Sequence, residues 1–138
     1  DSTDTALALN SAAASECSDL LVLSGEAGID DRLDHRLAVL GALGHPSLAR
    51  FDTITTYLGY AMVRTVHAGR SCVLEVPDGT LFSLLALHGM CSGVTVTGAR
   101  WELEAATLEA GSTRGISNLA AGEPWITCGD GVLTVVVP

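Results

Sequence analysis

Four charged or titratable residues, Asp31, Arg32, Asp34 and His35, lie within five consecutive positions. A guanidinium, two carboxylates and an imidazole at the start of a helix could bind a ligand, because α/β proteins often place ligands against helix N-termini. The alternative is an ordinary helix start, with Asp30 or Asp31 as the N-cap and a solvated first turn. Taken alone, the four residues favour this alternative, since first-turn acids are common. The rest of the chain favours a functional site.

The elements expected to position this cluster are a strand and a helix. The apolar run at 19–23 ends before Gly25 and Gly28, and leucines then recur every three or four positions from Leu33 to Leu43. This pattern predicts strand 19–24, a loop and helix 31–43. The cluster would therefore lie where the strand gives way to the helix.

A second group of acidic residues opens the chain. Asp1 and Asp4 are separated by Ser2 and Thr3, a spacing that could place both carboxylates near one hard cation. The alternative is that Asp1 belongs to a frayed terminus and that Asp4 is a first-turn acid. The alanine- and leucine-rich residues that follow predict a helix over 1–16.

The predicted elements fall into two parts. Residues 1–58, with a further strand in 52–60, are typical of part of an α/β domain with a parallel sheet. Residues 59–138 contain short apolar runs separated by glycine turns, which indicates an antiparallel β-sandwich. Within it, Gly129-Asp130-Gly131 predicts a hairpin, and residues 102–109 are expected to be helical or irregular. The apolar runs are 61–66, 71–76, 81–87, 94–99, 125–128 and 132–137.

One segment of the second part combines several polar groups. Residues 111–118, G-S-T-R-G-I-S-N, bring hydroxyls, a guanidinium and the amide of Asn118 together, as in sites that orient a ligand. The alternative is a turn made of good turn formers. Composition alone does not separate these two interpretations.

Composition restricts the class of protein. The chain has 138 residues, a net charge of −9 and no lysine, which argues against binding to the nucleic acid backbone. No apolar run approaches the roughly 18 residues of a membrane span, so we expect no membrane association. Cys17, Cys72, Cys91 and Cys128 lie far apart, without the spacing of a zinc or redox motif, and are expected to be buried free thiols. No leader segment is visible, so a cytoplasmic location is expected.

The motifs, taken in order, resemble those of the thiamine pyrophosphokinase (thiamine diphosphokinase) family. The similarity covers nearly the whole chain, and an ordered series is more specific than any single motif. The motifs of this series are D-S-T-D-T-A-L-A-L, a strand ending in glycines and R-L-D-H, G-T-L-F-S-L-L-A-L, G-V-T-V-T-G-A-R-W-E-L, G-S-T-R-G-I-S-N and a closing apolar hairpin.

The resemblance implies a fold, an activity and an assembly. The fold would be an α/β domain, here residues 1–58, followed by a β-sandwich, residues 59–138, that binds thiamine and forms a homodimer. The activity would be transfer of pyrophosphate from ATP to the thiamine hydroxyl, with Mg²⁺, giving thiamine diphosphate and AMP. Thiamine is a cation, so an acidic chain is suited to attracting it.

The resemblance also assigns roles to individual residues. Asp1 and Asp4 match the acidic D-x-T-D motif near the metal. Arg32 and Asp34 match the motif at the phosphates and the substrate hydroxyl, where a fork-shaped guanidinium can neutralise phosphate charge and a carboxylate can orient the hydroxyl or accept its proton. Ser117 and Asn118 match the pair beside thiamine.

The chain departs from the family pattern in two places. The strands that usually precede D-x-T-D, with a G-D-x-D-S motif, are absent, and more residues than usual lie between the last glycine and Arg32. Activity of this chain alone is therefore expected to be low. The alternative to an active enzyme is a catalytically impaired or truncated member that dimerises and binds thiamine or a related cation.

Overall fold

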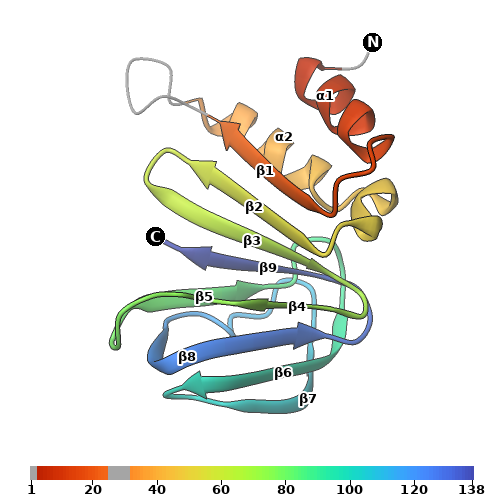
Figure 1. The fold of residues 1–138 in the computed structure, drawn as a ribbon. Helices are drawn as coiled ribbons and strands as arrows, with labels where there is room; N and C mark the ends of the chain where they lie inside the picture. Colours follow the sequence, from red (N-terminus) through yellow and green to blue (C-terminus); the bar gives the residue numbers. More distant parts are fainter. Residues whose placement is uncertain (1–2, 25–31) are drawn as a thin grey trace.

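The fold combines helices with a large, mostly antiparallel sheet. The computed structural model describes residues 3–24 and 32–138 (Figure 1). In chain order the elements are α1 (Asp4–Ala13), β1 (Asp19–Ser24), α2 (Leu33–Ala42), the 3₁₀ helix η1 (Pro46–Arg50), β2 (Thr53–Leu58), β3 (Ala61–His67), β4 (Arg70–Val73), β5 (Leu81–Leu85), β6 (Cys91–Ala99), β7 (Leu103–Leu108), β8 (Asn118–Cys128) and β9 (Val132–Val137).

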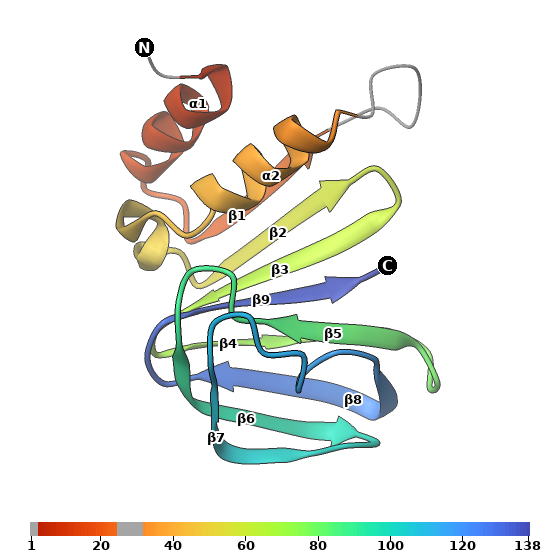
Figure 2. The same ribbon diagram turned by 180° about the vertical axis from the view of Figure 1, so that it is seen from behind.

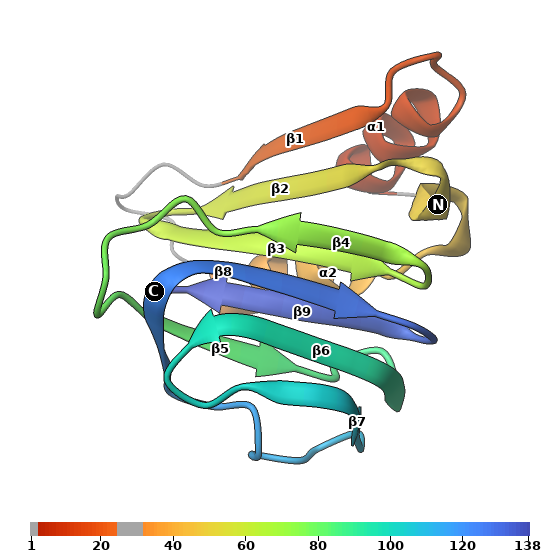
Figure 3. The ribbon, with the colours of Figure 1, turned by 60° about the horizontal axis from the view of Figure 1, so that its bottom comes forward.

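The strands form one hydrogen-bonded path that folds over into two layers. Its order is β1-β2-β3-β9-β5-β8-β6-β7, with β4 paired to β8. The pairing of β1 with β2 is parallel and the other named strand pairs are antiparallel. Only two residue pairs, Leu81 with Leu119 and Phe82 with Asn118, join β5 to β8. The layer β4-β8-β6-β7 therefore turns over the other strands (Figure 3).

Two apolar cores stabilise this arrangement. The helices cover one face of β1, β2 and β3, where Val39, Phe51, Ile54 and Val63 belong to one buried cluster (Figure 2). The other core lies between the two sheet layers and is larger. It contains Val66, Cys72, Leu74, Phe82, Leu84, Ala86, Cys91, Val94, Val96, Ala99, Leu108, Ile126, Cys128, Leu133 and Val135.

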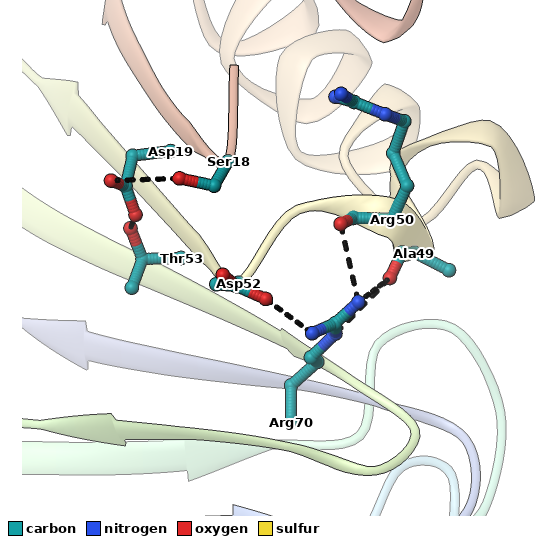
Figure 4. A network of polar contacts seen from close by, with 7 residues as sticks. All are labelled: Ser18, Asp19, Ala49, Arg50, Asp52, Thr53 and Arg70. Atoms are coloured by element: carbon teal, nitrogen blue, oxygen red, sulfur yellow. Dashed lines mark hydrogen bonds and ion pairs between the residues drawn. The ribbon is translucent and has the colours of Figure 1, made fainter. Parts of the chain in front are cut away.

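At the amino ends of β1 and β2, a network of hydrogen bonds and ion pairs joins η1 to β4 (Figure 4). The Arg70 guanidinium donates to the carbonyls of Ala49 and Arg50, each at 3.2 Å, and pairs with the Asp52 carboxylate. The last carbonyls of a helix lack intrahelical partners, so a cation at this place satisfies them. Arg70 thereby fixes the end of η1 against the sandwich.

The sequence predicts most elements correctly. Strands are present where the apolar runs indicated them, and the predicted helices are α1 and α2, both shorter than expected. Each helix has ten residues, far fewer than a membrane span needs. The helix cap differs from the prediction: Arg32 is the N-cap of α2 and makes no side-chain cap bond. Asp30 and Asp31 lie outside the described residues.

Three other predictions are wrong. Residues 102–109 contain strand β7, because their backbone pairs with β6 rather than forming a helix. Gly129-Asp130-Gly131 does not close a hairpin, since β9 pairs with β3 and β5 whereas β8 pairs with β4, β5 and β6. The link crosses between the layers, and Asp130 bridges to Ser92 instead. Cys17 is exposed, although the other cysteines are buried.

The fold is thus mostly β, with α1 and α2 and a mixed sheet, as predicted in outline. The division into residues 1–58 and 59–138 stays a prediction. The sheet itself is continuous across that boundary, because Leu58 of β2 pairs with Ala61 of β3.

Two histidines, the buried His67 and the half-buried His88, lie where the helical layer meets the sandwich. His67 Nε2 donates to the carbonyl of Leu43 at 3.0 Å, and His88 packs against Gly44, where an added Cβ would lie 2.2 Å from His88 Nδ1. Burial lowers the pKa of both imidazoles, and the charge of Arg70 lowers that of His67 further. Both rings are therefore neutral in the native protein near pH 7.

We expect the free energy of unfolding to fall on acidification below about pH 6.5, where unfolded histidine begins to bind a proton that the native rings resist. Each histidine contributes at most about 1.4 kcal/mol per pH unit. Urea unfolding at pH 7.5 and pH 5.5 measures this loss. His88→Gln should reduce this loss. Equal pH dependence of the parent and of His88→Gln would contradict the assignment.

Candidate functional site

A cavity of about 450 Å³ lies at the carboxyl end of β1. Open α/β sheets bind ligands at this end of their strands. The N-terminus of α1, the last residue of β1 and the first turns of α2 form its walls, so Asp4 and His35 face one cavity. The lining residues are Thr3, Asp4, Thr5, Ser24, His35, Ala38 and Val39.

Asp4 is placed by the cap of α1. Thr3 is the N-cap, and its Oγ1 accepts a hydrogen bond from the Ala6 N–H at 3.2 Å. Asp4 is the first helical residue and is exposed, where the helix dipole favours a carboxylate. Asp1, the predicted second metal ligand, lies outside the described residues. Among residues 3–24 and 32–138, no group of three or more His, Cys, Asp or Glu side chains could hold a metal.

Arg32 and Asp34 form a two-point ion pair beside this cavity. Arg32 Nη2 lies 2.5 Å from Asp34 Oδ2, and Arg32 Nε donates to Asp34 Oδ1 at 3.1 Å. Asp34 Oδ1 also accepts from the His35 N–H at 3.0 Å. The hydrogen bond from Arg32 lowers the pKa of Asp34, and the same bond raises the pKa of Arg32.

The ion pair makes Asp34 a weaker base and occupies the Arg32 donors predicted to bind phosphate. Asp34 is ionised at neutral pH, and its lowered pKa makes it a weaker proton acceptor than an ordinary aspartate. The donors of Arg32 that face Asp34 would have to turn or be shared to reach a phosphate. Both side chains are more than half exposed, so this exchange meets little steric resistance.

A smaller cavity, of about 70 Å³, lies beside the G-I-S-N turn. It is formed where the turn before β8 meets β5 and the β6–β7 link. The side chain of Trp101 is 53% exposed here, and the Arg100 guanidinium lies 4.8 Å from its ring centroid. The lining residues are Leu84, Trp101, Leu103, Arg114, Gly115, Ile116 and Asn118.

Asn118 holds the β6–β7 link to the start of β8. Its Oδ1 accepts from the N–H groups of Trp101 at 3.2 Å and Leu119 at 2.8 Å, and its Nδ2 donates to the Trp101 carbonyl at 2.7 Å. One Nδ2 hydrogen is left for another partner. Asn118 therefore positions Trp101 beside the cavity as well as lining it.

Ser117 has a different environment. Its backbone is left-handed, with φ of 64°, and its N–H donates to Ser83 Oγ at 3.0 Å. A non-glycine residue with positive φ is uncommon and costs free energy. The exposed Ser117 side chain is not among those that line the cavity.

The structure divides the predicted residues between two places. Asp4 lies on the larger cavity and Arg32 and Asp34 beside it, whereas Asn118 lies on the smaller one. Sequence reasoning placed His35 in the first cluster but gave it no role, although it lines the cavity. It missed Trp101 altogether. The signal was a single aromatic residue after Arg100, where the apolar run of β6 ends.

Part of the chain matches a known protein family. Residues 71–133 match the family model described as thiamin pyrophosphokinase, vitamin B1 binding domain. The predicted resemblance to thiamine pyrophosphokinases is confirmed. The matched residues include the smaller cavity at Trp101 and Asn118 but not Asp4, Arg32 or Asp34.

Solved structures show a similar fold. The chain superposes on thiamine pyrophosphokinase from Bacillus subtilis with a TM-score of 0.74 at 19% identity, covering 99% of this chain and 63% of that one. For the Geobacillus thermodenitrificans thiamin pyrophosphokinase the TM-score is 0.72 at 20% identity, covering 99% and 61%. The Candida albicans enzyme gives 0.63 at 13%, covering 86% and 43%.

The chain thus spans about three fifths of the two bacterial chains. No curated protein matches it. At these identities the solved structures establish the fold, and the activity of this chain is a separate question.

Replacing Asn118 should cost stability as well as ligand contact. We expect Asn118→Ala to lower the free energy of unfolding by about 1–3 kcal/mol, because the part-buried hydrogen bonds to the backbone groups of Trp101 and Leu119 are lost. Urea unfolding measures this loss. Ser117→Ala, at an exposed neighbouring side chain, should change stability by less than about 0.5 kcal/mol. Equal effects of the two substitutions would show that the Asn118 hydrogen bonds do not stabilise the turn.

Proposed function

We propose that this chain acts in a thiamine pyrophosphokinase, which transfers pyrophosphate from ATP to the thiamine hydroxyl and gives thiamine diphosphate and AMP in the cytoplasm. The observation that carries the proposal is the match of residues 71–133 to a vitamin B1 binding domain. The cavity at the carboxyl end of β1 supports it, because helix N-termini at such a place favour bound phosphate.

The smaller cavity has groups suited to thiamine. Thiamine is an aromatic cation, and a half-exposed indole can attract it by a cation–π contact. In the proposal Trp101 gives this contact, and the free Nδ2 hydrogen of Asn118 is available for a ring nitrogen. Ser117 stays a proposed thiamine residue whose hydroxyl would have to turn toward the ligand.

Mg²⁺ and ATP would bind on the helical side. Mg²⁺ is commonly held by one or two carboxylates together with substrate phosphates, so Asp4, with Asp1, is a fitting but minimal donor set. When bound, the ion would neutralise charge on the phosphates. Arg32 would bind a phosphate oxygen, and Asp34, released from Arg32, would orient the thiamine hydroxyl or accept its proton.

The separation of the two cavities supports a homodimer. They share no lining residue, and β1 and β5, which flank them, are four strand spacings apart, about 19 Å by the usual spacing. A thiamine at one cavity and a nucleotide at the other would not meet within a single chain. Two copies, each contributing one cavity, would bring the groups together.

The alternative is an impaired family member that dimerises and binds thiamine or a related cation without turnover. One observation favours it: Asp4 is the only described carboxylate on the larger cavity. Thiamine binding without release of AMP would support this alternative over the enzyme.

The dimer can be tested directly. We expect light scattering at about 50 µM to give twice the mass of one 14.2 kDa chain, because an interface of standard size persists in this range. Residues 60–138 are expected to form most of the contact. A mass of one chain at every concentration up to this value would refute the dimer.

Catalysis can be tested by a coupled assay of AMP release with thiamine, ATP and Mg²⁺. We expect at most trace turnover from this chain and robust turnover from one extended by the strands that carry G-D-x-D-S. In the extended protein, Asp34→Asn should lower turnover about a hundredfold, whereas Glu109→Gln, at an exposed turn, should not.

Two results would contradict this assignment. Robust turnover by the chain alone would show that Asp1 and Asp4 suffice for the metal. An unchanged rate for Asp34→Asn would remove Asp34 from the mechanism.

A further inference from the structure

A groove of about 570 Å³ lies along β4, apart from both cavities described above. Its floor is the face of β2 and β3 that points away from the helices. Its volume is within the range of small-molecule sites. The lining residues are Thr53, Thr55, Tyr57, Met62, Arg64, Ser71, Cys72, Val73 and Glu75.

The backbone of β4 forms one wall of this groove. Ser71, Cys72 and Val73 are consecutive, and side chains of consecutive strand residues point to opposite faces, so the groove follows the edge of the strand. The Leu74 N–H donates to the Pro124 carbonyl at 2.9 Å. Because hydrogen-bonded residues alternate in an antiparallel pair, Cys72 bonds toward β8 and Ser71 and Val73 present their N–H groups to the groove.

The floor of the groove carries a cation without a partner. Arg64 is paired in register with Thr55 and Val135, and its Nε is buried and makes no hydrogen bond. Within the described part of the chain, its guanidinium forms no ion pair or hydrogen bond that would satisfy it. An unpaired buried donor leaves the charge of Arg64 poorly compensated. Nε itself is enclosed, so an anionic oxygen in the groove would bind the guanidinium through its other N–H groups.

The remaining walls restrict the class of anion. Met62, Val73 and the Tyr57 ring provide apolar surface near Arg64. Glu75 lines the groove from an exposed position, and its charge would repel a ligand that carries more than one negative charge. We propose that this groove binds a small monocarboxylate with a short apolar tail, its carboxylate on Arg64 and the N–H groups of β4.

The proposal can be tested by NMR with hexanoate as the probe at pH 7. We expect the Arg64 Nε–H resonance to shift and saturate during the titration. Acetate should bind at least about tenfold more weakly, because it lacks the four methylenes of the tail, and inorganic phosphate should also bind more weakly than hexanoate because of Glu75. Arg64→Gln should weaken hexanoate binding about tenfold or more. Arg100→Gln, which removes an arginine stacked on Trp101 outside the groove, should leave it unchanged.

A further variant guards against loss of folding in Arg64→Gln. Glu75→Gln, at an exposed residue, should tighten hexanoate binding about two- to fivefold by removing a nearby negative charge. A shift that grows without saturating, or equal affinity in Arg64→Gln and the parent, would overturn the site. Phosphate binding more tightly than hexanoate, or no gain in Glu75→Gln, would overturn the assigned class of ligand.

Discussion

The alternation of side chains along β3 is the constraint on which the two halves of the structure depend. Val63 points into the core beneath the helices and Val66 into the core between the sheet layers. The partners on β9 follow the same rule, with Val136 against the helical core and Leu133 in the sandwich core. A shift of register by one residue would exchange the two faces. Both cores therefore stabilise one register, and the helices and the sandwich are held at a fixed orientation.

This shared strand also separates the chemistry into two places. Strands β1 and β2 run parallel, and the start of α2 and the cavity at Asp4 lie at the carboxyl end of β1. The strand order continues through β3 and β9 to β5. There Phe82 pairs with Asn118, which lies at the turn beside the smaller cavity. Polar groups on the two cavities are thus positioned by elements that belong to different cores. In the proposed enzyme, assembly of two copies would overcome a separation that the sheet imposes.

Much of the fold could be predicted from the sequence because local patterns determine it. The leucine spacing from Leu33 to Leu43 and the glycine-bounded apolar runs identify α2 and the strands. The errors arise where pairing is not local. Nothing near Gly129-Asp130-Gly131 indicates that β8 and β9 belong to different layers, since Asp130 finds its partner at Ser92 of β6. Residues 103–108 pair with β6 although their own pattern is ambiguous.

The residues of the candidate site can be picked out in the sequence, whereas their arrangement cannot. The acidic and basic residues at Asp4, Arg32 and Asp34 are visible in the sequence, whereas the ion pair that occupies Arg32 depends on the backbone at the start of α2. Trp101 becomes part of a site only through the hydrogen bonds of Asn118. The central claim is that this turn forms a thiamine site, and calorimetric titration of the chain with thiamine tests it most directly. The account predicts saturable binding that Trp101→Ala weakens about tenfold while Trp125→Ala, at the other tryptophan, leaves it unchanged. Absence of binding, or equal binding by both variants and the parent, would contradict it.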